Sequence, residues 1–200
     1  MDIDRFAGKA GSYDHNPDRV DNVHSIGNAI LQAIAFDPAM HIIDFGSGTG
    51  LLLERIAPRV RKITAVDVST AMTAQLRAKL GRVACEVEIA EIDLEKSDLP
   101  GTFDGIISSM TMHHIQDVQA MFCKFHSLVK PGGFIAISDL DLEDGSFHSE
   151  DTGVHHFGFD RDEFARMAVA AGFSSALVST ASVVSKPQGE FPVFLLTAVR

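Results

Sequence analysis

An apolar run that ends in a glycine-rich turn, HIIDFGSGTG at residues 41–50, constrains the fold of this chain more than any other stretch. The run is short and apolar, which suits a buried strand, and the residues after the turn suit a helix. Gly46, Gly48 and Gly50 let the backbone bend tightly and approach a ligand without a side-chain collision. Three glycines also weaken the start of a helix, so we expect a ligand to use the space that they leave.

Strand-like and helix-like segments alternate along most of the chain, which predicts a parallel sheet with helices on both faces. The expected strands are residues 41–45, 62–68, 84–92, 103–110, 134–140, 175–185 and 191–199. The expected helices are residues 18–36, 51–57, 70–80, 117–129 and 160–172, with a sharp turn at 130–133 (KPGG). The last two strands are joined by a turn too short for a parallel crossover. We therefore predict an α/β, Rossmann-like fold with a seven-stranded, mostly parallel sheet and one antiparallel strand near the C-terminus.

Length and composition favour a single domain, because 200 residues of which 46% are hydrophobic can bury a sizeable core. Within it we expect an N-terminal lid segment and helix at 1–37, a cofactor-binding core at 41–140, and a substrate-side loop, helix and strand pair at 141–200. No apolar run is long enough to span a membrane and the N-terminus has no signal-peptide centre, so we expect a cytoplasmic protein. Cys85 and Cys123 fit no metal spacing and are interpreted as buried thiols.

The spacing of the glycines indicates which class of nucleotide ligand the turn would bind. It is G-x-G-x-G, whereas dinucleotide sites favour G-x-G-x-x-G, and no Gly-Lys-Ser/Thr follows as in a phosphate-binding loop. The turn therefore favours a nucleoside ligand without a pyrophosphate. Asp67 closes the second strand, where a carboxylate can accept from both ribose hydroxyls, and Asp93 closes the third, where it can accept from an adenine amino group. The plainer interpretations are a helix-capping acid for Asp67 and a solvated loop acid for Asp93.

Four segments in order resemble the successive motifs of class I S-adenosylmethionine-dependent methyltransferases: IIDFGSGTG, AVDVS, EIDLEKSDLPGTFDGIISSMTMHHI and SLVKPGGFIAISDL. The match covers roughly residues 42–140 and is similar to the small-molecule group that includes ubiquinone- and menaquinone-biosynthesis enzymes. The resemblance implies S-adenosylmethionine as cofactor, S-adenosylhomocysteine as product, and in-line attack of a small-molecule acceptor on the sulfonium methyl. By position it implies cofactor contacts for Asp44, Gly46, Ser47, Gly48, Gly50, Asp67, Val68, Met72, Asp93, Leu94, Ser109 and Met110.

Three segments are candidates for the substrate side. The MHHI segment follows the fourth strand, near the expected sulfonium, and we take His114 as the candidate general base. A hydrogen-bonding or packing role is the alternative for both histidines of that segment. The resemblance implies that the segment before the first helix folds over the cofactor as a lid, and that the GVHHFGF segment shapes the pocket. The alternatives are an ordinary helix-entry segment for the first, and for the second a surface loop whose phenylalanines pack on the helix that follows. We predict substrate contacts for Tyr13, His113, His155, His156 and Phe157.

Other functions are less well supported by the sequence. The acidic motif of magnesium-dependent catechol-type methyltransferases is replaced by SSMTMHH, so we expect no metal, and arsenic methylation would need accessible thiols. A net charge of −10 argues against nucleic-acid binding, and no Asn-Pro-Pro-Tyr or Asp-Pro-Pro-Tyr follows the fourth strand. A non-catalytic module that binds S-adenosylmethionine or S-adenosylhomocysteine is the main alternative, followed by a nicotinamide oxidoreductase. The sequence does not fix the acceptor, the methylated atom or the oligomeric state.

Overall fold

The fold is described by a computed structural model for residues 4–148 and 153–200. The strands are β1 His41–Phe45, β2 Lys62–Val66, β3 Glu86–Ala90, β4 Phe103–Ser109, β5 Val129–Leu140, β6 Ser174–Lys186 and β7 Gly189–Val199. The helices are α1 Pro17–Ala33, α2 Leu51–Ile56, α3 Thr70–Lys79, α4 Val118–Leu128 and α5 Arg161–Ala170, with short 3-10 turns at Ala10–His15, Ala57–Arg59, Leu80–Arg82 and Met112–His114. None of the helices in these two ranges is both long and apolar enough to cross a membrane.

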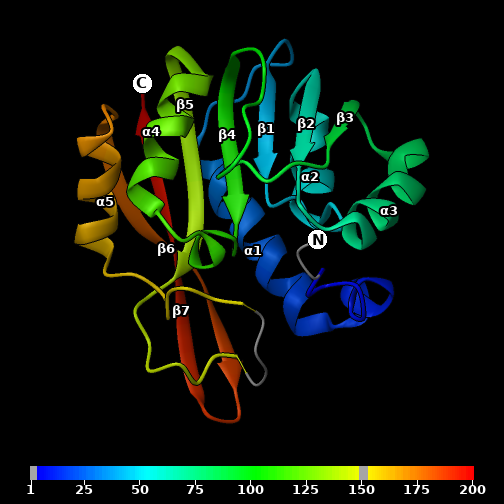
Figure 1. The fold of residues 1–200 in the computed structure, drawn as a ribbon, viewed down its shortest axis with the longest axis vertical. Helices are drawn as coiled ribbons and strands as arrows, with labels where there is room; N and C mark the ends of the chain where they lie inside the picture. The colour runs from blue at the N-terminus through cyan, green and yellow to red at the C-terminus, as the bar shows by residue number, and fades with distance from the viewer. Residues whose placement is uncertain (1–3, 149–152) are drawn as a thin grey trace.

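The strands described for these residues form one seven-stranded sheet in the order β3-β2-β1-β4-β5-β7-β6 (Figure 1). β1 pairs in parallel with β2 and with β4, while β7 is antiparallel to both β5 and β6. The predicted fold class is confirmed, including the one antiparallel strand. The chain leaves β1 in one direction toward β2 and later returns on its other side with β4, so a crevice is expected at the carboxyl ends of these two strands.

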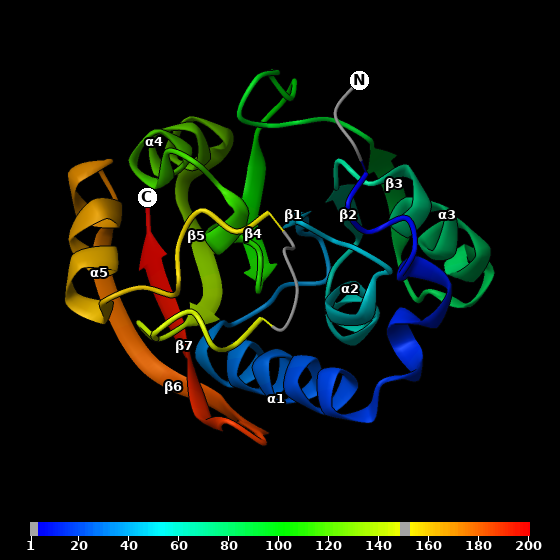
Figure 2. The same ribbon diagram turned by 60° about the horizontal axis from the view of Figure 1, so that its bottom comes forward.

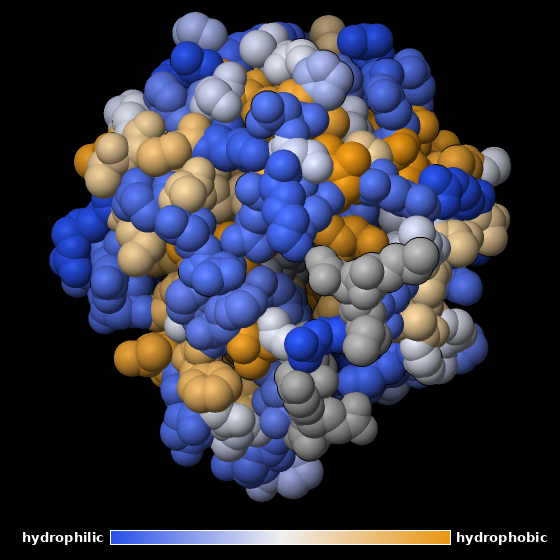
Figure 3. Space-filling model, viewed as in Figure 1, coloured by the Kyte–Doolittle hydropathy of each residue, from blue (hydrophilic) through white to orange (hydrophobic). Residues whose placement is uncertain are grey.

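Helices cover both faces of the sheet, as Figures 1 and 2 show together. On one face, α4 and α5 pack on the sheet through an aromatic group in which the ring of Phe164 lies 5.0 Å from those of both Phe122 and Phe194. On the other face, α1 and α2 pack through residues such as Ile26, Ile30 and Leu53. The carboxyl ends of β1, β2 and β4 point toward the N-terminal segment in Figure 1. Figure 3 shows apolar surface between polar side chains near the middle of the molecule in the same view.

Two expectations about local structure are wrong. Residues 130–133 form part of β5 rather than a free turn, because Gly132 and Gly133 exchange backbone hydrogen bonds with Arg200 and so extend the pairing of β5 with the end of the chain. Cys123 is exposed and Cys85 is half-buried. Cys123 lies on α4 but off the stripe of buried side chains that begins at Val118, so burial of one helix face leaves its thiol outside.

Candidate active site

A cavity of about 510 Å³ lies at the carboxyl ends of β1, β2 and β4. The last residues of these strands, Phe45, Val66 and Ser109, form part of its wall. The N-terminal segment, α1 and the end of β6 close it from other sides. Its volume lies within the range of roughly 300–1,000 Å³ that is usual for small-ligand sites. The cavity therefore occupies the crevice that the strand order predicts.

The glycine turn forms the floor of this cavity, and each glycine has its own reason to be there. Gly46, Gly48 and Gly50 all have positive φ angles, of 69°, 52° and 87°, which side chains other than glycine rarely adopt. A Cβ on Gly46 would overlap Thr111, and a Cβ on Gly50 would overlap Leu76. A Cβ on Gly48 would meet nothing within 4 Å, because this position faces the open cavity. Two of the glycines are thus explained by close packing, and Gly48 is the one whose bare backbone faces the space for a ligand.

Asp67 holds the turn in place and also lines the cavity. Its Oδ2 accepts the N–H of Gly48 at 2.7 Å, and its Oδ1 accepts the N–H of Ser69 at 2.8 Å. Burial raises the pKa of this carboxyl, and these two backbone bonds oppose the rise. A carboxylate offers about four acceptor positions, so two bonds leave room for hydroxyl donors of a ligand. The capping alternative is not what the structure shows, because Ser69 is the residue whose side chain caps α3.

Asp44 lies beneath the turn, where its side chain is 1% exposed. Burial, and next the charge of Asp67, raise the pKa of Asp44 to about 8, while a backbone hydrogen bond from Leu53 at the start of α2 lowers it. Within the described part of the chain, Asp44 Oδ2 and the hydroxyls of Ser47 and Ser109 are buried without a hydrogen-bond partner. Buried polar atoms without partners cost free energy. Of these three residues, Ser109 lines the cavity, and a donor or acceptor of a ligand there would satisfy its hydroxyl.

The other end of the cavity is bordered by residues that follow β2 and β3. Val68 is 64% exposed, Met72 and Leu94 are buried, and all three line the cavity. Asp93 also lines it, but its Oδ1 accepts the N–H of Glu95 and its Oδ2 pairs with Lys96 at 2.8 Å. Apolar side chains of this kind are suited to pack against a flat ring system. Asp93 would have to share its carboxylate between such a ligand and its present partners.

His113 and Asp139 form a buried pair at the wall of the cavity. His113 Nδ1 lies 2.7 Å from Asp139 Oδ1, and the backbone N–H of His113 donates to Asp139 Oδ2. The two side chains are 2% and 0% exposed. A carboxylate accepts from Nδ1–H, which leaves Nε2 as the ring atom able to accept a proton. Just before this pair, Met110 lines the cavity with a φ of 56°, a strained conformation of the kind found at functional sites.

His114 lies beside His113 but in a different electrostatic setting. Its ring makes an edge contact with Phe6 at 5.6 Å between centroids, and its Nδ1 lies 3.3 Å from the carbonyl oxygen of Gly153. Burial, and next the nearby His113, lower the pKa of His114 to about 4. A third ring, His148, lies 5.2 Å from that of His113. Among the described residues, no three His, Cys, Asp or Glu side chains are arranged to hold a metal ion.

The N-terminal segment is tied down over the turn. Asp4 accepts from the Ser69 hydroxyl at 2.9 Å, and Asp14 accepts from the Thr49 hydroxyl at 2.6 Å. Tyr13 lines the cavity, and the guanidinium of Arg19 lies 4.0 Å from the centre of its ring. Burial raises the pKa of the Tyr13 phenol. The structure thus places Tyr13 in the cavity wall, where the sequence predicted a lid.

His155, His156 and Phe157 lie outside the cavity, contrary to the pocket position that the sequence predicted for them. The backbone N–H groups of His155 and His156 donate to the carbonyl oxygen of His113, and His156 Nε2 lies 2.9 Å from that of Ile115. Phe157 is 54% exposed. This loop therefore supports the turn that carries His113 through backbone contacts. The side chains of His155, His156 and Phe157 are not part of the cavity lining.

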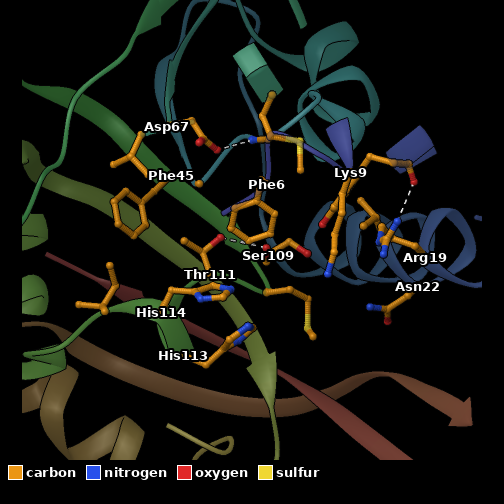
Figure 4. Close-up of a pocket in the computed structure, with 18 of the residues that line it drawn as sticks. Phe6, Lys9, Arg19, Asn22, Phe45, Asp67, Ser109, Thr111, His113 and His114 are labelled. Atoms are coloured by element: carbon orange, nitrogen blue, oxygen red, sulfur yellow. Dashed lines mark hydrogen bonds between the residues drawn. The ribbon is translucent and has the colours of Figure 1, made fainter. Parts of the chain in front are cut away.

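Several cavity residues were missed by sequence reasoning: Phe6, Lys9, Arg19, Asn22, Phe147, His148 and Lys186. Figure 4 shows Lys9, Arg19 and Asn22 gathered on the side of the cavity opposite Phe45. These residues come from the N-terminal segment, α1, the loop after β5 and the end of β6, which meet only in the folded chain. The KPQGE turn that contains Lys186 was the one sequence signal, and it showed only that the chain reverses there.

Residues 42–133 match the family model of a methyltransferase domain. The chain contains a class I methyltransferase domain. An uncharacterized methyltransferase of Schizosaccharomyces pombe is 31% identical over 166 residues, which cover 74% of this chain and 57% of that protein. A ubiquinone biosynthesis O-methyltransferase of Xanthomonas campestris is 25% identical over 73% of this chain and 63% of its own length. The matched part of this chain thus spans roughly three fifths of the length of these curated relatives.

A solved structure shares the same fold. Phosphoethanolamine N-methyltransferase 2 of Haemonchus contortus, in complex with S-adenosylmethionine, superposes with a TM-score of 0.73 over 100% of this chain and 60% of that protein. The sequence identity is 17%, so this likeness concerns the fold alone. In the methyltransferase domain, the predicted cofactor residues that line the cavity are Gly46, Gly48, Asp67, Val68, Met72, Asp93, Leu94, Ser109 and Met110. Asp44, Ser47 and Gly50 support the turn from outside the lining.

Proposed function

We propose that this chain binds S-adenosylmethionine in the cavity and transfers its methyl group to a small-molecule acceptor. The observation that carries the proposal is the cavity at the glycine turn, which is lined by Gly46, Gly48 and the hydroxyl-bearing Ser109, whose Oγ is buried without a partner among the described residues. In a class I methyltransferase domain, this is the place where the methionine part of the cofactor would lie. Asp67 and the exposed backbone of Gly48 would hold the ribose, and Met72 and Leu94 would hold the adenine.

The cofactor, when bound, supplies an activated methyl group on a sulfonium that already carries its leaving group. The residues of this chain then have to orient the acceptor, exclude water and remove a proton where the acceptor carries one. Phe6, Tyr13 and Phe147 line the cavity and would exclude water from the side opposite the sheet. The acceptor would enter between these residues and the histidines.

We assign the proton acceptor to His113 rather than to His114. Asp139 fixes the His113 ring through Nδ1 and would stabilise the imidazolium that forms when Nε2 takes a proton from the acceptor. Among the residues that the structure describes, no carboxylate pairs with the His114 ring in this way, and the pKa of about 4 makes His114 a weak base at neutral pH. His114 and His148 would then serve as neutral walls that orient the acceptor.

A small-molecule acceptor is supported by the shape of the cavity. The space is bordered by the sheet, the N-terminal segment and the end of β6, which leaves little room for a folded protein or a nucleic-acid duplex. The net charge of −10 also disfavours nucleic acid. A non-catalytic module would bind the same cofactor without turnover, so catalysis has to be measured directly.

The test is a methyl-transfer assay with S-adenosylmethionine labelled in its methyl group and a whole-cell extract, whose small molecules, proteins and nucleic acids are separated after the reaction. We expect label in a low-mass product together with S-adenosylhomocysteine, and we expect the Asp139→Asn variant to form less of both. Label in protein or nucleic-acid fractions would contradict the small-molecule acceptor. Cofactor binding without any S-adenosylhomocysteine formation would favour the non-catalytic alternative.

A further inference from the structure

Positively charged side chains from three separate segments line the cavity: Lys9 from the N-terminal segment, Arg19 from α1 and Lys186 from the end of β6. The lining also includes the carboxylates of Asp18, Asp67, Asp93 and Glu95, so the cavity as a whole carries no excess of positive charge. The notable feature is that three cationic groups from segments distant in the sequence reach the same cavity. Figure 4 shows Lys9 and Arg19 on the same side of the cavity. Cationic groups gathered on one side of a cavity would attract an anion.

Neither Arg19 nor Lys186 forms an ion pair with a carboxylate among the residues that the structure describes. Arg19 Nη1 donates to the carbonyl oxygen of Tyr13 at 2.9 Å, and its guanidinium stacks on the Tyr13 ring. Lys186 Nζ donates to the carbonyl oxygen of Phe147 and lies 3.7 Å from the centre of its ring. These contacts fix the positions of the two cationic groups without neutralising their charge.

The charged groups around Lys186 also indicate that it lies close to Arg19. Burial, and next the charge of Arg19, lower the pKa of Lys186, while Glu143 opposes the shift. Asp18 also lines the cavity. Lys186 is in turn one of the groups that lower the pKa of His148, after burial and His113. Two like charges therefore act on each other inside a partly closed space, and an anion bound between them would relieve that repulsion.

We propose that Lys186 and Arg19 bind an anionic group, a carboxylate or a phosphate, on the methyl acceptor. This inference rests on the proposed function. It favours the acceptor because Lys186 contacts Phe147, whose ring lies beside that of His148, and His148 in turn lies beside His113. The predicted cofactor residues instead follow β1, β2, β3 and β4. An anion at Lys186 would thus hold the acceptor on the side of the cavity where His113 takes its proton.

The same chemistry could come from the carboxylate of the cofactor itself, and the experiment has to separate the two sources. Its probes are benzoate and benzamide, which have nearly the same shape but differ in charge. Their dissociation constants are measured by ligand-observed NMR on protein saturated with S-adenosylhomocysteine. The affinity for S-adenosylmethionine is measured separately by calorimetry. The variants are Lys186→Gln, Lys186→Arg, and the control Arg166→Gln, which removes a positive charge from an exposed position on α5.

We expect the wild type to bind benzoate at least about fivefold more tightly than benzamide, the scale of a charge-assisted hydrogen bond. Lys186→Gln should remove this preference while changing the affinity for S-adenosylmethionine by less than about twofold, and Lys186→Arg and Arg166→Gln should keep the preference. Equal binding of both probes to the wild type would overturn the inference, even if a variant failed to fold. A large loss of S-adenosylmethionine affinity in Lys186→Gln with the preference intact would also overturn it, by assigning the cation to the cofactor.

The two proposals fail in different ways. If S-adenosylmethionine and S-adenosylhomocysteine do not bind the wild type at all, the proposed function is wrong. The comparison of benzoate with benzamide on the unloaded protein then still decides whether Lys186 and Arg19 form an anion site.

Discussion

Replacement of Asp67 by alanine gives a quantitative test of the cofactor site. The carboxylate accepts the N–H groups of Gly48 and Ser69, and its remaining acceptor positions face the cavity. Loss of a charged acceptor for the ribose hydroxyls should weaken S-adenosylmethionine binding by about 1–3 kcal/mol, or roughly five- to 150-fold in Kd. The two freed N–H groups lie near a cavity that water can enter, so we expect the domain to remain folded.

The assay is isothermal titration of S-adenosylmethionine into wild type and Asp67→Ala, with a thermal melt to confirm folding. Asp98→Ala is the control, because the Asp98 side chain is 99% exposed and lies away from the cavity. A cofactor analogue without the ribose hydroxyls adds a test from the ligand side. The wild type should bind this analogue more weakly by a similar factor, and Asp67→Ala should not distinguish it from S-adenosylhomocysteine. Unchanged affinity in Asp67→Ala would refute the ribose assignment.

Three further predictions concern the turn and the histidine pair. Gly48→Val should reduce S-adenosylmethionine binding below detection by calorimetry. Its Cβ enters open space, so the circular dichroism spectrum should stay native, but the φ of 52° should lower the free energy of unfolding by about 1–2 kcal/mol. Normal binding would mean that the turn does not touch the ligand. Asp44 should contribute a fall in the free energy of unfolding from about pH 4 to pH 8, because unfolded Asp44 ionises near its ordinary value while the folded carboxyl, with a pKa of about 8, stays protonated. The lowered pKa values of His114 and His148 act in the opposite direction up to about pH 6.5, and they do so in the wild type and in Asp44→Asn alike, so the comparison of the two proteins isolates Asp44. Denaturant titrations should show that Asp44→Asn flattens this fall, and parallel profiles would contradict the assignment. Asp139→Asn should lower the methyl-transfer rate about 10²-fold or more with unchanged cofactor Kd, the scale of general-base catalysis; an unchanged rate would remove His113 from that role.

Much of the fold was predictable because it depends on local patterns. The alternation of strands and helices follows from the spacing of apolar residues. The short turn before Phe191 requires that the two strands it joins, β6 and β7, run antiparallel. The turn at residues 46–50 was predictable for the same reason, since residues other than glycine rarely adopt the φ angles found there. Asp67 was predictable as the acid that ends the second strand, although its hydrogen bond to Gly48 depends on how β1 and β2 pair.

The substrate side was harder to predict because it depends on where distant segments meet. Lys186 reaches the cavity because β6 and β7 stay paired beyond the end of β5 and β6 packs against α1, and nothing near Lys186 in the sequence fixes that path. The two histidines at 155 and 156 resembled pocket residues, but their backbone groups brace His113 instead. Asp139 lay in a predicted strand, and its role emerged only from the distance to the His113 ring.

Calorimetric titration of the wild type with S-adenosylmethionine, S-adenosylhomocysteine and NAD shows whether the cavity binds a sulfonium nucleoside. We expect micromolar binding of the first two ligands and none of NAD. Binding of NAD alone, or of none of the three, would contradict this expectation.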